Sequence, residues 1–155
     1  MQWTSEEAHD VLREASIADL KRLGIPRDRR VLVNRGRGND ELAPSAELLR
    51  EFLERKKVLE ERFGRGSETA HNRAFVECAY EARFRRQIEE DPAALERLAE
   101  LAARSGTEDV YLVCYEGPEK ACHRRILLRI AQERFGAEVE VTGVEPPAGS
   151  GPRQG

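Results

Sequence analysis

Two short apolar runs stand out in an otherwise charged sequence. Val31-Leu32-Val33 and Val110-Tyr111-Leu112-Val113-Cys114 are continuous and rich in β-branched residues, which is typical of strands buried on both faces of a sheet. Residues 138–144 alternate between polar and apolar positions, which predicts a further strand near an edge. Residues 11–20 fit a strand or a helix, and Gly24-Ile25-Pro26 ends whichever of them forms.

Apolar residues at intervals of three and four predict several helices. Ser45 is a suitable N-cap for a helix that runs through a charged stretch to Gly64. Val76, Tyr80, Phe84 and Ile88 form an i, i+4 ridge, which predicts one helix over about residues 72–89 with Cys78 packed in its middle. The remaining helices are expected after the capping box Thr4/Glu7, between Asp91-Pro92 and Ser105-Gly106, and between Cys122 and Gly136.

These elements predict the fold class. Helical segments separate the strands, and strand 110–114, helix 122–135 and strand 138–144 have the length of a βαβ crossover. We expect an α/β fold: a single small domain over residues 1–145, with a mostly parallel sheet of about four strands flanked by helices. Residues 146–155 form a Pro/Gly/Ser tail that we expect to be disordered.

Composition narrows the class of protein. Of the 155 residues, 39% are hydrophobic and 35% are charged, and the net charge of −3 creates no strong overall field towards nucleic acid or a membrane. The three cysteines are an odd number, which suits a reducing compartment, so we expect a cytoplasmic protein. No apolar run of about 18 residues is present, and the acidic N-terminus is unlike a signal peptide.

Candidate chemistry lies where the predicted strands end, because ligands of parallel sheets bind beyond the carboxyl ends of the strands. The first strand leads to Arg35 and Arg37 in a glycine-rich loop. The second leads to Cys114 and Glu116, and a helix then opens at Cys122-His123-Arg124. A helix N-terminus attracts anions and lowers the pKa of a nearby thiol. The sequence therefore predicts that both groups meet at one edge of the sheet.

Each candidate has an expected role and a plainer alternative. Arg35, Arg37 and Arg124 would bind an anion, His123 would act as general acid and base, and Glu116 would orient it. Cys114 or Cys122 would be the nucleophile or a redox thiol. Alternatively both cysteines are packed in the core, His123 is structural, Arg124 and Arg125 are solvated, and Arg35 and Arg37 form surface ion pairs.

No cofactor is implied, and two classes of function stay open. Cys114, Cys122 and His123 match no standard zinc spacing and lack a fourth ligand, so we expect no metal. A phosphate-binding Gly-x-x-x-x-Gly-Lys-Ser/Thr loop is absent. The expected partner is a small anionic ligand, phosphorylated or nucleotide-like. The alternative is a non-enzymatic module that binds protein or nucleic acid through arginines on its helices, namely Arg62, Arg65, Arg83, Arg85 and Arg86. The sequence does not determine the oligomeric state.

The segment VYLVCYEGPEKACHRRILLRIAQERFGAEVEV resembles the signature of the domain of unknown function 488 family: a strand, a Cys and an acidic residue, then Cys-His-Arg at a helix start. The segment ELAPSAELLREF and the segment VLVNRGRG resemble two further parts of that family, and the resemblance covers residues 11–145. The resemblance implies an α/β fold but no activity. It marks five residues as candidates for the site: Cys114, Glu116, Cys122, His123 and Arg124.

Overall fold

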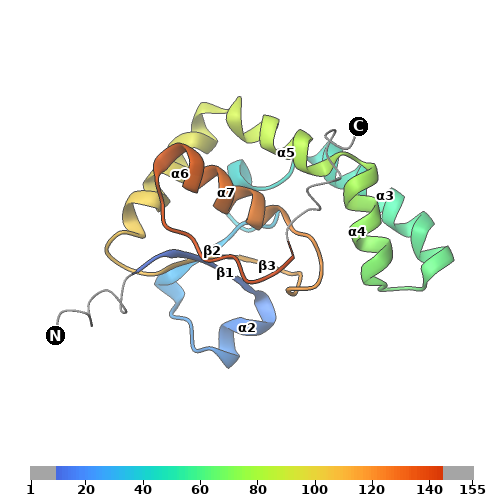
Figure 1. The fold of residues 1–155 in the computed structure, drawn as a ribbon, viewed down its shortest axis with the longest axis horizontal. Coiled ribbons are helices and arrows are strands. Elements are labelled where there is room, and N and C mark those ends of the chain that lie inside the picture. Colours follow the sequence, from blue (N-terminus) through green and yellow to red (C-terminus); the bar gives the residue numbers. More distant parts are fainter. Residues whose placement is uncertain (1–9, 145–155) are drawn as a thin grey trace.

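A parallel sheet of three strands lies at the centre of the computed structural model, which describes residues 10–144 (Figure 1). Strand β3 (Val110–Cys114) is in the middle, between β1 (Leu12–Ser16) and β2 (Arg30–Leu32). Both predicted apolar runs are strands, and the α/β class is confirmed. The predicted capping box at 4–7 and the predicted tail at 146–155 lie outside the described residues.

The sheet has three strands rather than the expected four. The segment predicted as a strand at 138–144 runs beside β1 but forms an isolated parallel bridge between Leu12 and Val139. Two backbone hydrogen bonds hold it, from Leu12 N to Glu138 O (2.9 Å) and from Glu140 N to Leu12 O (3.0 Å). Beyond this point the backbone turns to other partners: Thr142 N and Gly143 N both donate to the buried Glu14 carboxylate, which ends the ladder.

The ambiguous residues 11–20 contain both a strand and a helix. β1 ends at Ser16, and α2 (Ile17–Arg22) begins directly after it. The change is made by a capping box, in which the Ser16 hydroxyl accepts from Asp19 N and the Asp19 carboxylate accepts from Ser16 N. Because two element types share ten residues, a single periodicity cannot describe this stretch.

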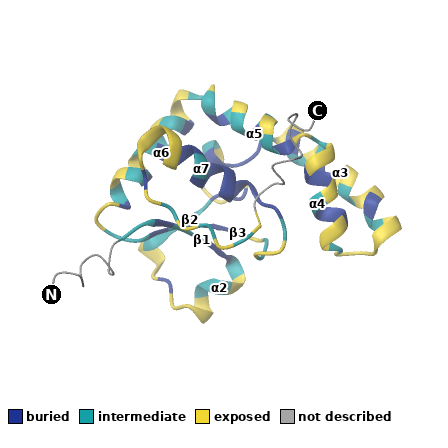
Figure 2. Cartoon of the chain, in the orientation of Figure 1, coloured by how far each residue is buried: buried dark blue, intermediate teal, exposed yellow. Residues whose placement is uncertain are grey.

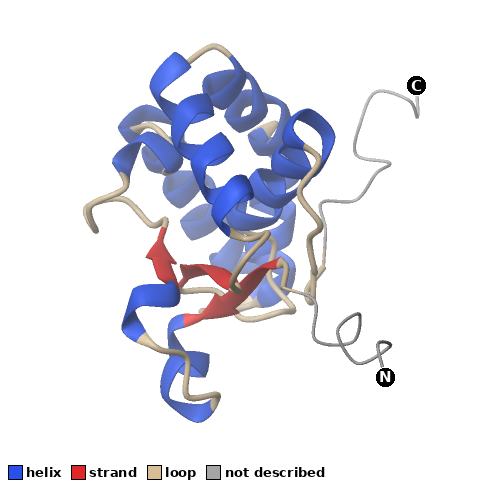
Figure 3. Cartoon of the chain, turned by 90° about the vertical axis from the view of Figure 1, so that its left-hand side faces the viewer, coloured by secondary structure: helices blue, strands red, loops and turns tan. Residues whose placement is uncertain are grey.

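Helices cover both faces of the sheet (Figure 3). α2 lies on one face, and α7 (His123–Phe135) packs on the other against β1 and β3. The helices α5 (Tyr80–Glu89) and α6 (Pro92–Arg104) pack in turn against α7. α7 is thus enclosed between the sheet and other helices, and most of it is buried (Figure 2).

A pair of helices extends from one end of this arrangement (Figure 1). α3 (Ala46–Phe63) and α4 (Glu68–Glu77) pack against each other, and each begins at a serine cap, Ser45 and Ser67. The predicted start and end of α3 are confirmed. Short 3₁₀ helices at Arg27–Arg29 and Asp40–Leu42 precede β2 and α3.

The predicted single helix over 72–89 is wrong, because the chain breaks at Cys78-Ala79. Ala79 has a left-handed backbone conformation with φ 54°, so α4 and α5 are separate helices that pack against each other. Three members of the predicted ridge, Tyr80, Phe84 and Ile88, are nevertheless buried together on α5. Cys78 caps the C-terminus of α4 and is only partly buried. In residues 10–144 no helix is long and apolar enough to span a bilayer.

Candidate functional site

A cavity of about 280 Å³ lies beyond the carboxyl ends of β2 and β3. Asn34 and Arg35 reach it from β2, Tyr115 and Glu116 from β3, and His123 from the start of α7. The structure therefore brings the two distant stretches to one rim of the sheet. The connection is direct, because His123 Nε2 lies 2.8 Å from the carbonyl oxygen of Val33.

The opposite wall is formed by the protruding helices. α3 contributes Phe52 and Lys56, α4 contributes His71 and Phe75, and α5 contributes Tyr80. The aromatic rings pack on one another: Phe75 stacks on Tyr80 with centroids 4.1 Å apart, and Phe52 meets Tyr80 edge-on at 5.4 Å. The cavity is thus an apolar cleft with a few polar groups, as small-molecule sites are.

The Cys122 sulfur is surrounded by hydrogen-bond donors. Cys122 is the N-cap of α7, its Sγ lies 3.8 Å from His123 Nδ1, and Arg124 donates from Nη1 to it at 3.6 Å. His123 Nε2 must carry a proton to donate to Val33 O, which leaves Nδ1 facing the sulfur. The predicted orienting residue for His123 was Glu116; the backbone carbonyl of Val33 holds the ring instead.

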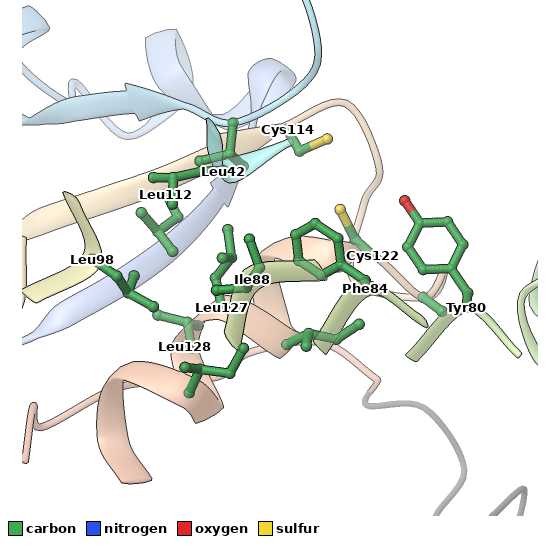
Figure 4. Packing of buried hydrophobic residues seen from close by; sticks show 14 of the residues in the cluster. Leu42, Tyr80, Phe84, Ile88, Leu98, Leu112, Cys114, Cys122, Leu127 and Leu128 are labelled. Atoms are coloured by element: carbon green, nitrogen blue, oxygen red, sulfur yellow. The ribbon is translucent and has the colours of Figure 1, made fainter. Parts of the chain in front are cut away.

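Cys114 and Glu116 lie beside this sulfur. The donor atoms of Cys114, Cys122 and His123 are all within 4.8 Å of one another, and Cys114 Sγ lies 3.8 Å from Glu116 Oε1. Figure 4 shows the two sulfurs and the Tyr80 hydroxyl at the same end of the hydrophobic cluster. Cys114 and Cys122 are 4% and 3% exposed and free of disulfide, so both are core residues that also line the cavity.

The surroundings make the two thiols differ. Burial raises the pKa of Cys122, but a hydrogen bond from Cys114 and the charges of His123 and Arg124 outweigh it, so the pKa lies well below its ordinary value. The hydrogen bond to Cys122 and burial both raise the pKa of Cys114. Burial lowers the pKa of His123, but the Cys122 thiolate outweighs this and raises it. The arrangement therefore favours a Cys122 thiolate beside a His123 imidazolium.

The predicted anion-binding arginines have different places. Arg35 lines the cavity and is exposed, with Nη1 donating to Pro44 O at 3.3 Å. Arg37 is exposed next to the cavity, where its Nη2 lies 3.5 Å from the hydroxyl of Tyr115. Arg124 is 1% exposed and lies behind the Cys122 sulfur. Lys56 on α3 is a second cation of the cavity wall, and no pattern in the sequence predicted it.

Arg124 and Arg125 are buried, so the expectation that they are solvated is wrong. The Glu14 carboxylate on β1 accepts from Arg124 Nε at 2.6 Å and from Arg125 Nε at 3.0 Å. Arg125 also donates to the backbone oxygens of Lys120 and Val144. Glu14 thus satisfies the two charges that open α7 and holds Arg124 against Cys122; it is a partner that the sequence analysis missed.

His71 was also missed. The side chain is 2% exposed, its Nε2 donates to Ala121 O at 2.8 Å, and its ring meets Phe52 edge-on at 5.0 Å. Burial lowers the pKa of His71 to about 4, and the charges of Lys56 and Lys120 also lower it. His71 is therefore neutral at pH 7, with Nδ1 unprotonated and without a hydrogen-bond partner in the part of the chain that the structure describes.

Cys114, Cys122 and His123 are also close enough to ligate one metal ion. They supply three donors of the kind that zinc prefers, with the cavity at the fourth position. The Arg124 guanidinium 3.6 Å from Cys122 Sγ is unfavourable for a dication at the same sulfur. The geometry accordingly suits a free thiolate better than a metal thiolate.

Ion pairs neutralise two of the five arginines of the alternative nucleic-acid surface, Arg83 and Arg85. Arg83 pairs with Glu51, with Arg83 Nη1 2.7 Å from the carboxylate. Arg85 pairs with Glu133 at 2.9 Å and with Glu89 at 3.3 Å. These two arginines have glutamate partners within the protein, so they offer little free charge for phosphates.

The fold and the site define a small α/β protein with a thiol–imidazole cluster at the strand ends. Residues 22–135 match the family described as "Active DUF488-N3 subclade" (DUF488-N3a), and the chain belongs to this family. The matched segment includes Arg35, Cys114 and the Cys122-His123-Arg124 start of α7. Comparison with curated proteins and with solved structures gives no significant match.

Proposed function

We propose that the cavity is a thiol-dependent active site for a small anionic substrate, phosphorylated or nucleotide-like, with the Cys122 thiolate as nucleophile. The observation that carries this proposal is the environment of one sulfur atom: His123 Nδ1 at 3.8 Å, the Arg124 guanidinium at 3.6 Å and the thiol of Cys114. An activated cysteine requires a nearby base or cation and access to a substrate. Cys122 has His123 and Arg124 beside its sulfur, and it lines the cavity through which a substrate would reach it.

The residues can carry a two-step transfer. The Cys122 thiolate attacks an electrophilic centre of the substrate, a bond from sulfur to that centre forms, and the leaving group departs with the Nδ1 proton of His123. Water then attacks the covalent intermediate while the neutral His123 accepts its proton, and the thiolate departs. His123 is thus the acid of the first step and the base of the second, and its hydrogen bond to Val33 O fixes the ring for both.

Two cations of the wall would hold the anionic part of the substrate. Arg35 lies at the end of β2 and Lys56 on α3, so they approach the cavity from different elements. An arginine fork and a lysine ammonium together suit a phosphate or carboxylate group. Arg37 lies farther out beside Tyr115, and we assign it to the approach of the substrate.

Alkylation by iodoacetamide tests the thiolate. At pH 7 we expect Cys122 to react faster than Cys78, and this reactivity should persist as the pH falls below about 8.5, the ordinary thiol pKa. Cys78 is an internal control, because it is more exposed while burial raises its pKa. Peptide mass spectrometry after timed quenching separates the sites. If neither Cys114 nor Cys122 reacts in the folded protein, the proposed thiol chemistry is wrong.

Protection by inorganic phosphate tests the anion site. Phosphate should slow the alkylation of Cys122 and leave the rate at Cys78 unchanged. Arg35→Ala and Lys56→Ala should each weaken this protection by about tenfold, the value of one charge-assisted hydrogen bond. Undiminished protection in both variants would contradict the anion site.

Metal analysis of the purified protein provides the competing outcome. One outcome would contradict the proposed nucleophile: the protein contains one equivalent of zinc, Cys114→Ser loses this zinc, and Cys122 reacts only after the metal is chelated. The site would then be a metal centre in which Cys122 is a ligand.

A further inference from the structure

Two buried acceptor atoms in residues of the cavity wall have no hydrogen-bond partner among residues 10–144, which the structure describes. They are His71 Nδ1 on α4 and Asn34 Oδ1 after β2. The residues are only 2% and 8% exposed, so bulk water does not solvate these atoms freely. A buried acceptor without a partner is unfavourable, and two in residues of the same cavity call for an explanation.

Both atoms are acceptors and therefore require a hydrogen-bond donor as a partner. His71 Nε2 is used as a donor to Ala121 O, so the neutral ring presents Nδ1 as an acceptor. Asn34 Oδ1 is an amide oxygen and can only accept. Neither atom can be satisfied by an ionised carboxylate or by an unprotonated phosphate oxygen, because these groups are acceptors themselves. The part of the ligand near them must therefore carry N–H or O–H donors.

The remaining walls limit the shape of that part. Phe52, Phe75 and Tyr80 line the same cavity as His71, and the Phe52 and His71 rings are in edge-to-face contact. Apolar and aromatic walls favour a flat, weakly hydrated group over a strongly hydrated one such as a sugar. A cavity of about 280 Å³ has room for one such ring.

We infer that the cavity binds a planar, ring-containing ligand whose amino or amide N–H groups donate to His71 Nδ1 and Asn34 Oδ1. This inference rests on the proposed function and deepens it: the ring occupies the apolar cleft, and an anionic substituent reaches Arg35 and Lys56. Recognition of a donor by a buried acceptor is strongly selective, because a ligand without the donor leaves the acceptor unpaired.

Pairs of small probes of equal shape test this inference. Benzamide and 2-aminopyrimidine carry N–H donors, and in acetophenone and 2-methylpyrimidine a methyl group replaces the NH₂ group. Titrations followed by NMR of the isotope-labelled protein give the dissociation constants. We expect each amino compound to bind about tenfold more tightly than its methyl partner. Equal affinities within both pairs would overturn the inference.

Two variants and one control locate the acceptors. Asn34→Leu removes the amide oxygen at similar volume, and Asn34→Asp retains an acceptor oxygen. His71→Gln keeps an N–H for Ala121 O but removes the ring nitrogen Nδ1. The preference for the amino compounds should fall in Asn34→Leu and His71→Gln and persist in Asn34→Asp. An unchanged preference in all three would place the probes elsewhere and contradict the inference.

Failure of this inference is distinguishable from failure of the proposed function. The Cys122 alkylation rate and its protection by phosphate depend on the thiolate and on the cations, and they can be measured without a probe. Reactive Cys122 with no preference for amino probes removes the ring ligand alone. If amino probes bind selectively while Cys122 is inert, the cavity is a binding site without thiol catalysis.

Discussion

Glu14 lies beneath the candidate site, and its removal should destabilise the protein far more than removal of a neighbouring surface charge. Its side chain is 0% exposed, and its carboxylate accepts from Arg124 Nε at 2.6 Å, Arg125 Nε at 3.0 Å and Thr142 N at 2.8 Å. In Glu14→Ala two buried guanidinium groups lose their counter-ion. Such a change is costly because the remaining charges stay desolvated.

The magnitude follows from burial. Breaking a buried ion pair by removing one partner costs about 3–5 kcal/mol. For a protein of this size each kcal/mol lowers Tm by about 2–4 °C, so we expect a loss of about 6–20 °C. Arg13→Ala is the matched control, because Arg13 is adjacent on β1, pairs with Asp109 and Glu140, and has a side chain 26% exposed. This control should cost less than about 1 kcal/mol.

Urea denaturation and scanning calorimetry of both variants measure the difference. Glu14→Gln adds a third point, because the amide keeps the shape but loses the charge, and its stability should lie between those of the wild type and Glu14→Ala. If Glu14→Ala and Arg13→Ala were equally stable, the buried network would contribute nothing and its role in holding Arg124 at the Cys122 sulfur would be refuted.

Three further predictions concern stability and are measured by the same denaturation experiments. Gly143→Ala should destabilise by about 1–3 kcal/mol, because the added Cβ would lie 2.1 Å from Nη2 of Arg125, which hydrogen bonds hold in place. Ala79→Gly should stabilise by about 1 kcal/mol, since glycine adopts the left-handed φ of 54° without strain. His71 should make the protein less stable as the pH falls from about 6.5 to 4. The pKa of its imidazole is about 4 in the folded protein and 6.5 in the unfolded chain, and this difference corresponds to about 3 kcal/mol of stability.

The sign of the pH effect follows from proton binding. Between these two values the unfolded chain binds the proton at His71 and the folded chain does not, so acid favours unfolding. His71→Gln should remove this part of the pH dependence, and an unchanged slope would show that His71 titrates normally. A Gly143→Ala variant of full stability would contradict the close approach of Arg125. A loss of stability in Ala79→Gly would contradict the left-handed conformation.

Local signals were sufficient for most elements. Continuous β-branched runs identified β2 and β3, and the caps Ser45 and Asp91 identified where α3 and α6 begin. The break at Ala79 could not be predicted, because alanine favours helices and the i, i+4 ridge continues across the break. The tertiary packing of α4 and α5 overrides the local preference there.

The candidate site was predictable only where its residues adjoin strand ends. Arg35, Cys114 and His123 follow from the rule that ligands bind at the carboxyl edge of a parallel sheet. Lys56 and His71 lie on α3 and α4, which form a wall of the cavity. The spacing of apolar residues predicts that these segments are helices, but not which part of the protein they pack over. Their discovery required the tertiary arrangement of α3 and α4.

The burial of Arg124 and Arg125 connects stability to chemistry. Two adjacent charges at a helix start are normally solvated, and here their burial depends on one carboxylate from β1, Glu14. Replacement of such a network by apolar residues is often neutral or favourable for stability, so stability alone does not account for it. The Arg124 guanidinium also contacts the Cys122 sulfur, where a fixed positive charge favours the thiolate in a site that burial would otherwise keep protonated. A network that apolar residues could replace without loss of stability, and that also places a positive charge at a cavity-lining cysteine, fits the proposed thiol-dependent site.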